Sequence, residues 1–164
     1  MRRLLIISPH FPPVNAPDMH RVRMSLPHLV EFGWETRVLA VDPSRVEGVE
    51  EPLLLETIPP CVPVHHCNAF DVCWTRKLGV GALAIRALPF LHRAGAAILR
   101  AHKADLVYFS TTMFPVMVLG RLWKRRFGVP FVVDMQDPWV SDYYERRPRL
   151  ERPRKHRLAQ RMLP

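Results

Sequence analysis

The sequence contains little glycine, and none in the patterns that usually hold phosphate. Seven glycines stand against 17 prolines in 164 residues. The first apolar run, residues 4–7, is followed by neither G-x-G-x-x-G nor G-x-x-x-x-G-K-[ST], which argues against a loop in which glycine backbone surrounds a phosphate. The sequence also lacks G-x-S-x-G and H-E-x-x-H, so a serine-hydrolase elbow and a zincin site are excluded.

Cysteine is also scarce. Three cysteines, an odd number, do not make a disulfide framework and are typical of a reducing compartment. Cys61, Cys67 and Cys73 lie near His65 and His66, but not at the spacing of paired C-x2-C ligands. We therefore expect no metal site there and interpret the thiols as buried or idle. Separately, no cofactor is expected for this chain.

Long hydrophobic runs are missing. Only four consecutive apolar residues follow the basic start, too few for a signal sequence. The longest apolar stretch, residues 78–99, is interrupted by Arg86, Pro89, His92 and Arg93, so it does not read as a membrane span. These features predict a cytoplasmic protein.

Acidic residues are outnumbered, with 15 Asp and Glu against 24 Lys and Arg. Residues 145–164 hold eight basic residues and two acidic ones. This segment is interpreted as a solvated basic helix or linker, with peripheral contact to an anionic membrane as the alternative. Arg121, Lys124 and Arg125 would extend the basic patch if they face the same way. Nucleic acid is not an expected partner, because no aromatic residues alternate with the basic ones for base stacking.

Apolar runs alternate with stretches of helical periodicity, which predicts a doubly wound, mainly parallel, Rossmann-like α/β fold. The expected strands are 4–8, 36–41, 62–67, 105–110 and 129–135. The expected helices are 19–32, 53–56, 80–102 with a bend near Pro89, and 114–127. Asp18 is expected to cap the first helix and Gly33 to end it. Thr111 or Thr112 is expected to cap the last helix, which would bury Val118, Leu119, Leu122 and Trp123 before Gly128 ends it.

Polar residues follow three of these strands directly. In a doubly wound sheet the carboxyl ends of parallel strands meet at one edge, where ligands bind. The candidate binding residues are Asn15, His20, Arg21, Arg23, Thr111, Thr112, Gln136 and Asp137. The alternatives are that the arginines face solvent, that His20 packs, and that the threonines only cap a helix. Asp134 and Asp137 are expected to sit in a cleft or to bind an arginine. No catalytic residue is assigned.

Two blocks of the sequence resemble the N-terminal domain of glycosyltransferase family four, whose members are retaining GT-B enzymes. The first is RLLIISPHFPPVNAPDMHRVRMSLPHLVEFGWETRVLAVDP, and the second is ADLVYFSTTMFPVMVLGRLWKRRFGVPFVVDMQDPW. Two positions differ from many members. The Asn15 to Asp18 region takes the place of a Gly-Gly pair, and Gln136 takes the place of a histidine or arginine.

The resemblance implies that residues 1–144 form the acceptor-side half of a GT-B fold, incomplete at its C-terminal end. A second Rossmann-like domain with an E-x7-E motif would hold the nucleotide-sugar, and the chain alone would be inactive. The implied partners are a nucleotide-sugar donor and a glycan or lipid-linked acceptor in glycan biosynthesis. From the missing targeting segment and the basic charge of 145–164, the expected localisation is cytoplasmic, with peripheral contact to the inner membrane face as the further expectation. The alternative function is a non-catalytic Rossmann-like module whose basic tail binds nucleic acid or membrane.

Overall fold

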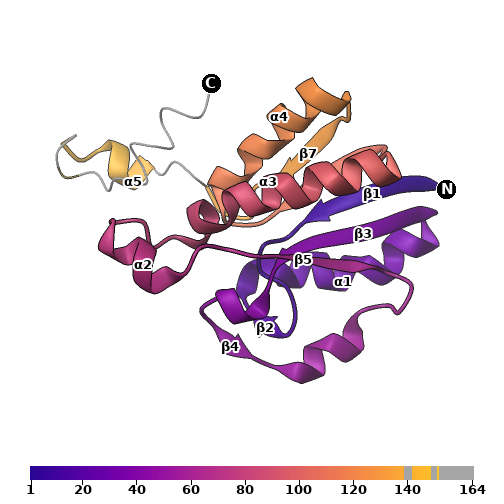
Figure 1. Ribbon diagram of the computed structural model, residues 1–164, viewed down its shortest axis with the longest axis horizontal. Helices are drawn as coiled ribbons and strands as arrows, with labels where there is room; N and C mark the ends of the chain where they lie inside the picture. The colour runs from indigo at the N-terminus through magenta and orange to yellow at the C-terminus, as the bar shows by residue number, and fades with distance from the viewer. Residues whose placement is uncertain (139–141, 149–150, 152–164) are drawn as a thin grey trace.

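A parallel five-stranded sheet forms the centre of the molecule (Figure 1). The computed structural model describes residues 1–138, 142–148 and 151. The strands are β1 (Arg2–Ile7), β2 (Val14–Asn15), β3 (Trp34–Val41), β4 (Val49–Glu50), β5 (Val64–Cys67), β6 (Leu106–Ser110) and β7 (Phe131–Asp134). The main sheet has the order β5-β3-β1-β6-β7, and all its pairs are parallel. Strands β2 and β4 form a separate antiparallel pair.

Helices cover both faces of the sheet. The α-helices are α1 (His20–Glu31), α2 (Val72–Lys77), α3 (Leu83–His102), α4 (Val118–Phe127) and α5 (Asp142–Glu145). The 3-10 helices are η1 (Pro17–Met19), η2 (Pro43–Arg45), η3 (Pro52–Thr57) and η4 (Phe114–Met117). The doubly wound Rossmann-like fold is thereby confirmed. Within the described ranges, no helix combines the length and apolar character needed to cross a membrane.

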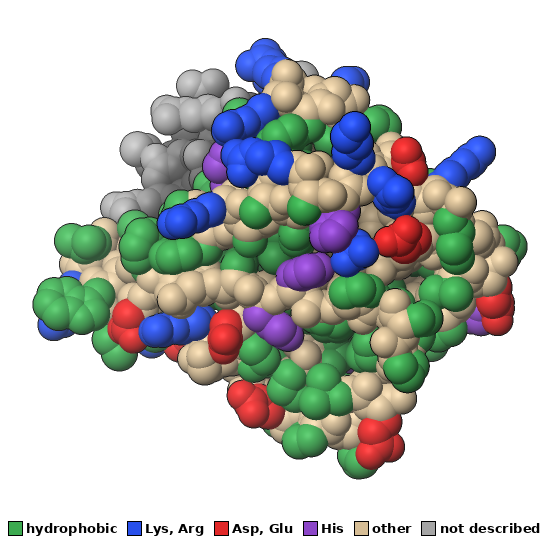
Figure 2. All heavy atoms as spheres, turned by 45° about the vertical axis from the view of Figure 1, so that its right-hand side comes forward, with side chains coloured by type: hydrophobic (Ala, Val, Ile, Leu, Met, Phe, Trp, Pro, Cys, Tyr) green, Lys and Arg blue, Asp and Glu red, His purple; other side chains and the backbone are tan. Residues whose placement is uncertain are grey.

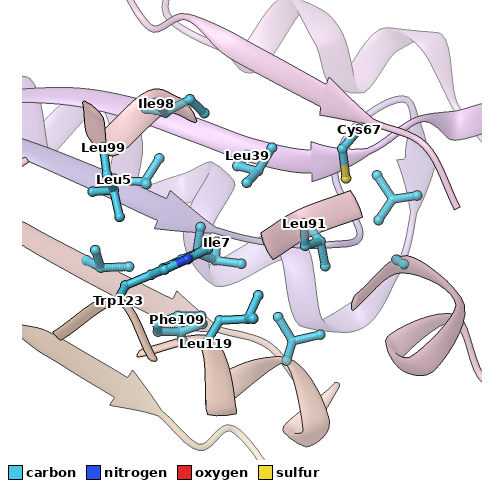
Figure 3. Close-up of a cluster of buried hydrophobic side chains, with 14 of the residues drawn as sticks. Leu5, Ile7, Leu39, Cys67, Leu91, Ile98, Leu99, Phe109, Leu119 and Trp123 are labelled. Carbon is cyan, nitrogen blue, oxygen red and sulfur yellow. The ribbon is translucent and has the colours of Figure 1, made fainter. Parts of the chain in front are cut away.

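The sheet has a separate core on each face because side chains alternate along a strand. Leu5 and Ile7 of β1 face α3 and α4, where they pack with Leu91 and Trp123 (Figure 3). The alternate residues of β1, Leu4 and Ile6, pack with Val22 and Leu26 of α1. The continuous apolar run of β1 therefore reflects a strand buried on both faces.

Several expected boundaries shift by a few residues. Strand β3 begins at Trp34, β5 begins at Val64 and α3 begins at Leu83. A separate helix, α2, precedes α3 and was not expected. It begins at an Asx-type cap in which Asp71 accepts from the Cys73 N–H at 2.8 Å. Gly33 and Gly128 end their helices with positive φ, as predicted.

The buried stripe of α4 differs from the predicted one. Leu119 and Trp123 are buried, but Val118 and Leu122 are 36% and 44% exposed. The glycine at position 120 decides this, because a Cβ there would lie 2.5 Å from the ring of Phe131. The helix can approach β7 only through Gly120, and that contact turns Val118 and Leu122 outward.

The two predicted helix caps are wrong. Met19, not Asp18, occupies the N-cap of α1, and no side chain caps that helix. Thr111 and Thr112 precede η4, whose N-cap is Met113. Asp18 and Thr111 are hydrogen-bonded to each other across distant segments, and the Thr111 hydroxyl also accepts a local hydrogen bond from the N–H of Met113 at 3.0 Å.

The boundary predicted at residue 144 falls inside α5, and residues 152–164 lie outside the described part of the chain. The division into 1–144 and 145–164, and the basic helix or linker, therefore stay predictions.

Candidate functional site

The candidate site lies where the winding of the sheet reverses. The chain moves from β1 outward to β3 and β5, then returns to the other side of β1 as β6 and β7. In such sheets the loops after the two strands at the reversal diverge and leave a ligand-binding crevice. Here those loops follow β1 and β6. Together with the loop after β7, they are connected by side-chain hydrogen bonds.

Asp18 is the centre of these connections. It belongs to η1, is 4% exposed, and lies beside the loop that follows β6. Its carboxylate accepts a hydrogen bond from the hydroxyl of Thr111 at 2.8 Å and from the N–H of Thr112 at 3.3 Å. His10 Nδ1 lies 2.8 Å from the other carboxylate oxygen. The prediction that the carboxyl ends of the expected strands 4–8 and 105–110 meet is therefore confirmed, since these strands correspond to β1 and β6.

The ionisation of Asp18 reflects a balance between burial and these contacts. Burial by itself raises the pKa of a carboxyl group, because it disfavours the charged form. The hydrogen bond and charge of His10, with the donors from Thr111 and Thr112, outweigh that effect and hold the pKa of Asp18 below its ordinary value. A buried carboxylate thus stays charged at the junction of the two loops.

Gln136 joins the loop after β7 to the same junction. Its side-chain amide donates to the backbone oxygen of Asp18 at 2.7 Å and to the hydroxyl of Ser110 at 3.0 Å. Both acceptor residues are buried, with Asp18 4% exposed and Ser110 0% exposed. Gln136 is therefore held by two segments. This fixes the position of the next residue, the exposed Asp137, at the carboxyl edge of the sheet.

A second carboxylate, Asp134, lies at the end of β7. Its carboxylate accepts hydrogen bonds from the guanidinium of Arg21 at 2.6 Å, from the hydroxyl of Ser110 at 2.8 Å and from the hydroxyl of Tyr108 at 3.0 Å. Burial chiefly raises the pKa of Tyr108, and the hydrogen bond to Asp134 raises it further. The expectation that Asp134 binds an arginine is confirmed.

Three of the predicted binding residues lie apart from this cluster. Asn15 belongs to the β2–β4 pair and donates to Glu51 at 2.8 Å. Arg23 donates to the hydroxyl of Thr57 in η3 at 3.0 Å, and its other terminal nitrogen lies 3.4 Å from His20. These contacts direct Asn15, His20 and Arg23 toward β4 and η3. The structure brings together Arg21, Thr111, Thr112 and Gln136, with Asp137 next to them.

Sequence reasoning missed His10 and Asp18 as members of the site. A carboxylate directly before a helix has the pattern of an N-cap. The pair Thr111–Thr112 after β6 offered donors, but nothing in the sequence indicated that Asp18 would receive them. A proline-bounded loop with one histidine and one aspartate was the only available signal.

The thiols and histidines of residues 61–73 do not converge. Cys67 lies in the core, and burial raises its pKa to about 12. Cys61 and Cys73 are exposed. Among the described residues no group of three metal-binding side chains comes together.

The comparison with protein families identifies the domain. Residues 20–163 match the family of glycosyl transferase 4-like domains. The chain belongs to that family. Among curated proteins, none matches the chain.

One solved structure agrees with this glycosyl transferase 4-like domain at the level of the fold. The apo structure of UGT2 from Phytolacca americana superposes with a TM-score of 0.56 at 12% identity, over 81% of this chain. A UDP-galactose 4-epimerase superposes with a TM-score of 0.42 at 14% identity, over 80% of this chain and 54% of its own. The domain spans 29% of the length of the UGT2 chain.

Proposed function

We propose that this glycosyl transferase 4-like domain is the acceptor-binding half of a nucleotide-sugar-dependent glycosyltransferase. The observation that carries the proposal is the set of polar side chains at the edge of the sheet where β1, β6 and β7 end. It offers hydroxyl, amide and carboxylate side chains, and the loop after β1 has no glycine pattern for a phosphate. Such side chains match the hydroxyl groups of a sugar acceptor, each of which both donates and accepts hydrogen bonds.

Each group at the edge has a distinct part in this proposal. Asp18, with His10 and Thr111, holds the loops after β1 and β6 at a fixed separation, which pre-organises the edge. Arg21, with a side chain 56% exposed, keeps a partly free guanidinium beside Asp134. Thr112 and Asp137 are then the groups placed to contact an acceptor hydroxyl.

The proposed reaction transfers a sugar with retention of its anomeric configuration to a glycan or lipid-linked acceptor. Retention rests on the resemblance to glycosyltransferase family four. The nucleotide-sugar would be held mainly by a second domain, so this chain alone should transfer no sugar. We place the reaction in glycan biosynthesis in the cytoplasm, with the basic segment 145–164 in contact with the inner membrane face.

Kinetics on a protein that contains this chain and a donor-binding domain test the acceptor role. Thr112→Val and Asp137→Asn should raise KM for the acceptor while leaving KM for the nucleotide-sugar unchanged. Glu31→Gln, at the exposed end of α1, removes a charge away from the edge and is the matched control. Nuclear magnetic resonance of the product reports the anomeric configuration, and an inverted product would refute retention.

Calorimetry on residues 1–164 tests the division of labour. We expect weak binding of nucleotide-sugars at best, and micromolar affinity would contradict an acceptor-side role. The alternative, a non-catalytic module, predicts no transfer by the longer protein with any donor.

A further inference from the structure

Charge is unevenly divided along the chain. Residues 72–133 contain ten Lys and Arg but one acidic residue, Asp105. Residues 1–71 contain six Lys and Arg against nine Asp and Glu. In Figure 2 the Lys and Arg side chains gather over the upper part of the molecule, where α3 and α4 lie, and most acidic ones lie below. The fold therefore collects positive charge on the α3–α4 side of the sheet.

Seven of these ten residues form one exposed surface, here named the basic face. Its members are Arg93, Arg100, Lys103, Arg121, Lys124, Arg125 and Arg126, and all are exposed. Helices α3 and α4 pack side by side on the same face of the sheet, so these side chains belong to one layer.

No counter-charge balances the basic face. Within the described part of the chain, none of its seven members forms an ion pair with a carboxylate. Of the other basic residues in 72–133, Arg76 pairs with Glu47 at 2.8 Å, and Arg86 is buried. The single acid, Asp105, accepts from the backbone N–H of Arg3 at 2.7 Å. The positive charge of the face is therefore directed at solvent.

Helix stability does not require this arrangement. Cations in the last turn of a helix are favourable, which accounts for Arg100 and for Lys124 to Arg126. Arg121 lies in the first half of α4, and with Arg125 it makes a like-charge pair at i, i+4, which destabilises a helix. Arg93 lies in the middle of α3. Arg93 and Arg121 therefore need an explanation outside the helices.

A hollow between the ends of α3 and α4 adds a pocket to the basic face. It has a volume of about 340 Å³ and is lined by Leu99, Arg100, Lys103, Ala104, Phe127 and Val129. The guanidinium groups of Arg100 and Arg126 lie 5.9 and 5.6 Å from the centre of the Phe127 ring. An apolar floor with cationic walls suits an anionic group that carries an apolar chain.

Exposed aliphatic residues favour a bilayer over nucleic acid as the partner. Val118 and Leu122 stand among the cations of α4 and are exposed. Aliphatic side chains between Lys and Arg are typical of helices that lie in a membrane interface. Binding to single strands relies on exposed aromatic rings, whereas Trp123 of α4 is fully buried.

We infer that the basic face of α3 and α4 binds the surface of an anionic bilayer, with a lipid phosphate in the hollow between the helix ends. The face is separate from the basic segment 145–164. It does not depend on the chain being a transferase, so the failure of one proposal leaves the other standing.

Co-sedimentation of the full chain with vesicles tests the inference. Phosphatidylcholine vesicles containing phosphatidylglycerol should bind the chain, and pure phosphatidylcholine vesicles should not. A Lys or Arg near an anionic surface contributes about 1 kcal/mol, so Arg121→Gln with Arg125→Gln should lower the partition coefficient roughly 30-fold. Arg93→Gln with Arg100→Gln on α3 should cause a similar loss. Added salt should weaken binding, because it screens the attraction.

The matched control removes the same charge from elsewhere. Arg2→Gln with Arg45→Gln lowers the net charge equally but lies on β1 and η2, so binding should change less than twofold. Thermal melting verifies that all three double variants fold, and the variant without the Arg121–Arg125 like-charge pair should melt no lower than wild type. Equal binding to neutral and anionic vesicles, or tighter binding to a single-stranded oligonucleotide, would overturn the inference. So would an equal loss of vesicle binding in the control variant. A loss of vesicle binding only when residues of the tail are changed to Ser would also overturn it; those residues are Arg152, Arg154, Lys155 and Arg157.

Discussion

Replacing Asp18 is the most direct test of the candidate site. The carboxylate is 5% exposed and has three donors within 3.3 Å, from His10, Thr111 and Thr112. Asp18→Ala leaves these donors buried without their acceptor. Removing one partner from a buried charged pair costs about 3–5 kcal/mol, and we expect a loss of that size in the free energy of unfolding.

Asp18→Asn separates charge from shape. Its amide oxygen can still accept from Thr111 or Thr112, but it has no charge to attract His10. We expect a smaller loss, about 1–2 kcal/mol, in keeping with one weakened hydrogen bond to a charged group. Asp137→Asn removes an exposed carboxylate from the same edge and is the matched control, with an expected change within about 0.5 kcal/mol.

The pH dependence of unfolding provides an independent measurement. Because the folded-state pKa of Asp18 lies below its unfolded value, the carboxylate contributes stability that is present above the unfolded pKa. That stability is lost as pH falls through the folded pKa. Wild-type stability should therefore decrease below about pH 4 more steeply than that of Asp18→Asn.

Urea unfolding, followed by tryptophan fluorescence and by circular dichroism, measures these differences. An Asp18→Ala variant within about 1 kcal/mol of wild type would refute the idea that Asp18 holds the two loops together. Identical acid dependence in wild type and Asp18→Asn would refute the assigned ionisation.

Three further predictions concern the packing around the sheet. Gly95→Ala should lower the free energy of unfolding by about 1–3 kcal/mol, because a Cβ there would lie 2.4 Å from the Trp123 ring. A variant that is more stable than wild type in urea would contradict this close packing. Arg86→Met should lower the free energy of unfolding by about 3 kcal/mol, because the buried guanidinium donates hydrogen bonds to three backbone oxygens. Arg86→Lys keeps the charge and should lower it by less in the same assay. With Ellman's reagent at pH 8, the exposed thiols of Cys61 and Cys73 should react quickly. Cys67 should react only after unfolding, because burial raises its pKa to about 12. Three fast-reacting thiols in the native protein would contradict the fold.

The sequence by itself determined the strands and the edge at which the loops meet. Strands buried on both faces must be continuous apolar runs, so residues 4–7 and 106–109 stand out from their surroundings. Parallel strands joined by helices then place their carboxyl ends together. That reasoning needed only local pattern and chain geometry, and it located the segments that carry Thr111 and Gln136.

Only the tertiary structure decided which polar side chains meet at that edge. Asp18 and Thr111 are 93 positions apart, and Arg21 and Asp134 are 113 apart. Their pairing depends on loop conformations that no local pattern specifies, so the local pattern at Asp18 predicts a helix cap. The orientation of α4 was decided in the same way, since the close contact of Gly120 with Phe131 selects one of two apolar stripes. Contacts between distant segments outweigh local propensity here for two reasons. The buried carboxylate of Asp18 needs hydrogen-bond donors, which only distant residues supply. Close packing of α4 on β7 removes apolar surface from water.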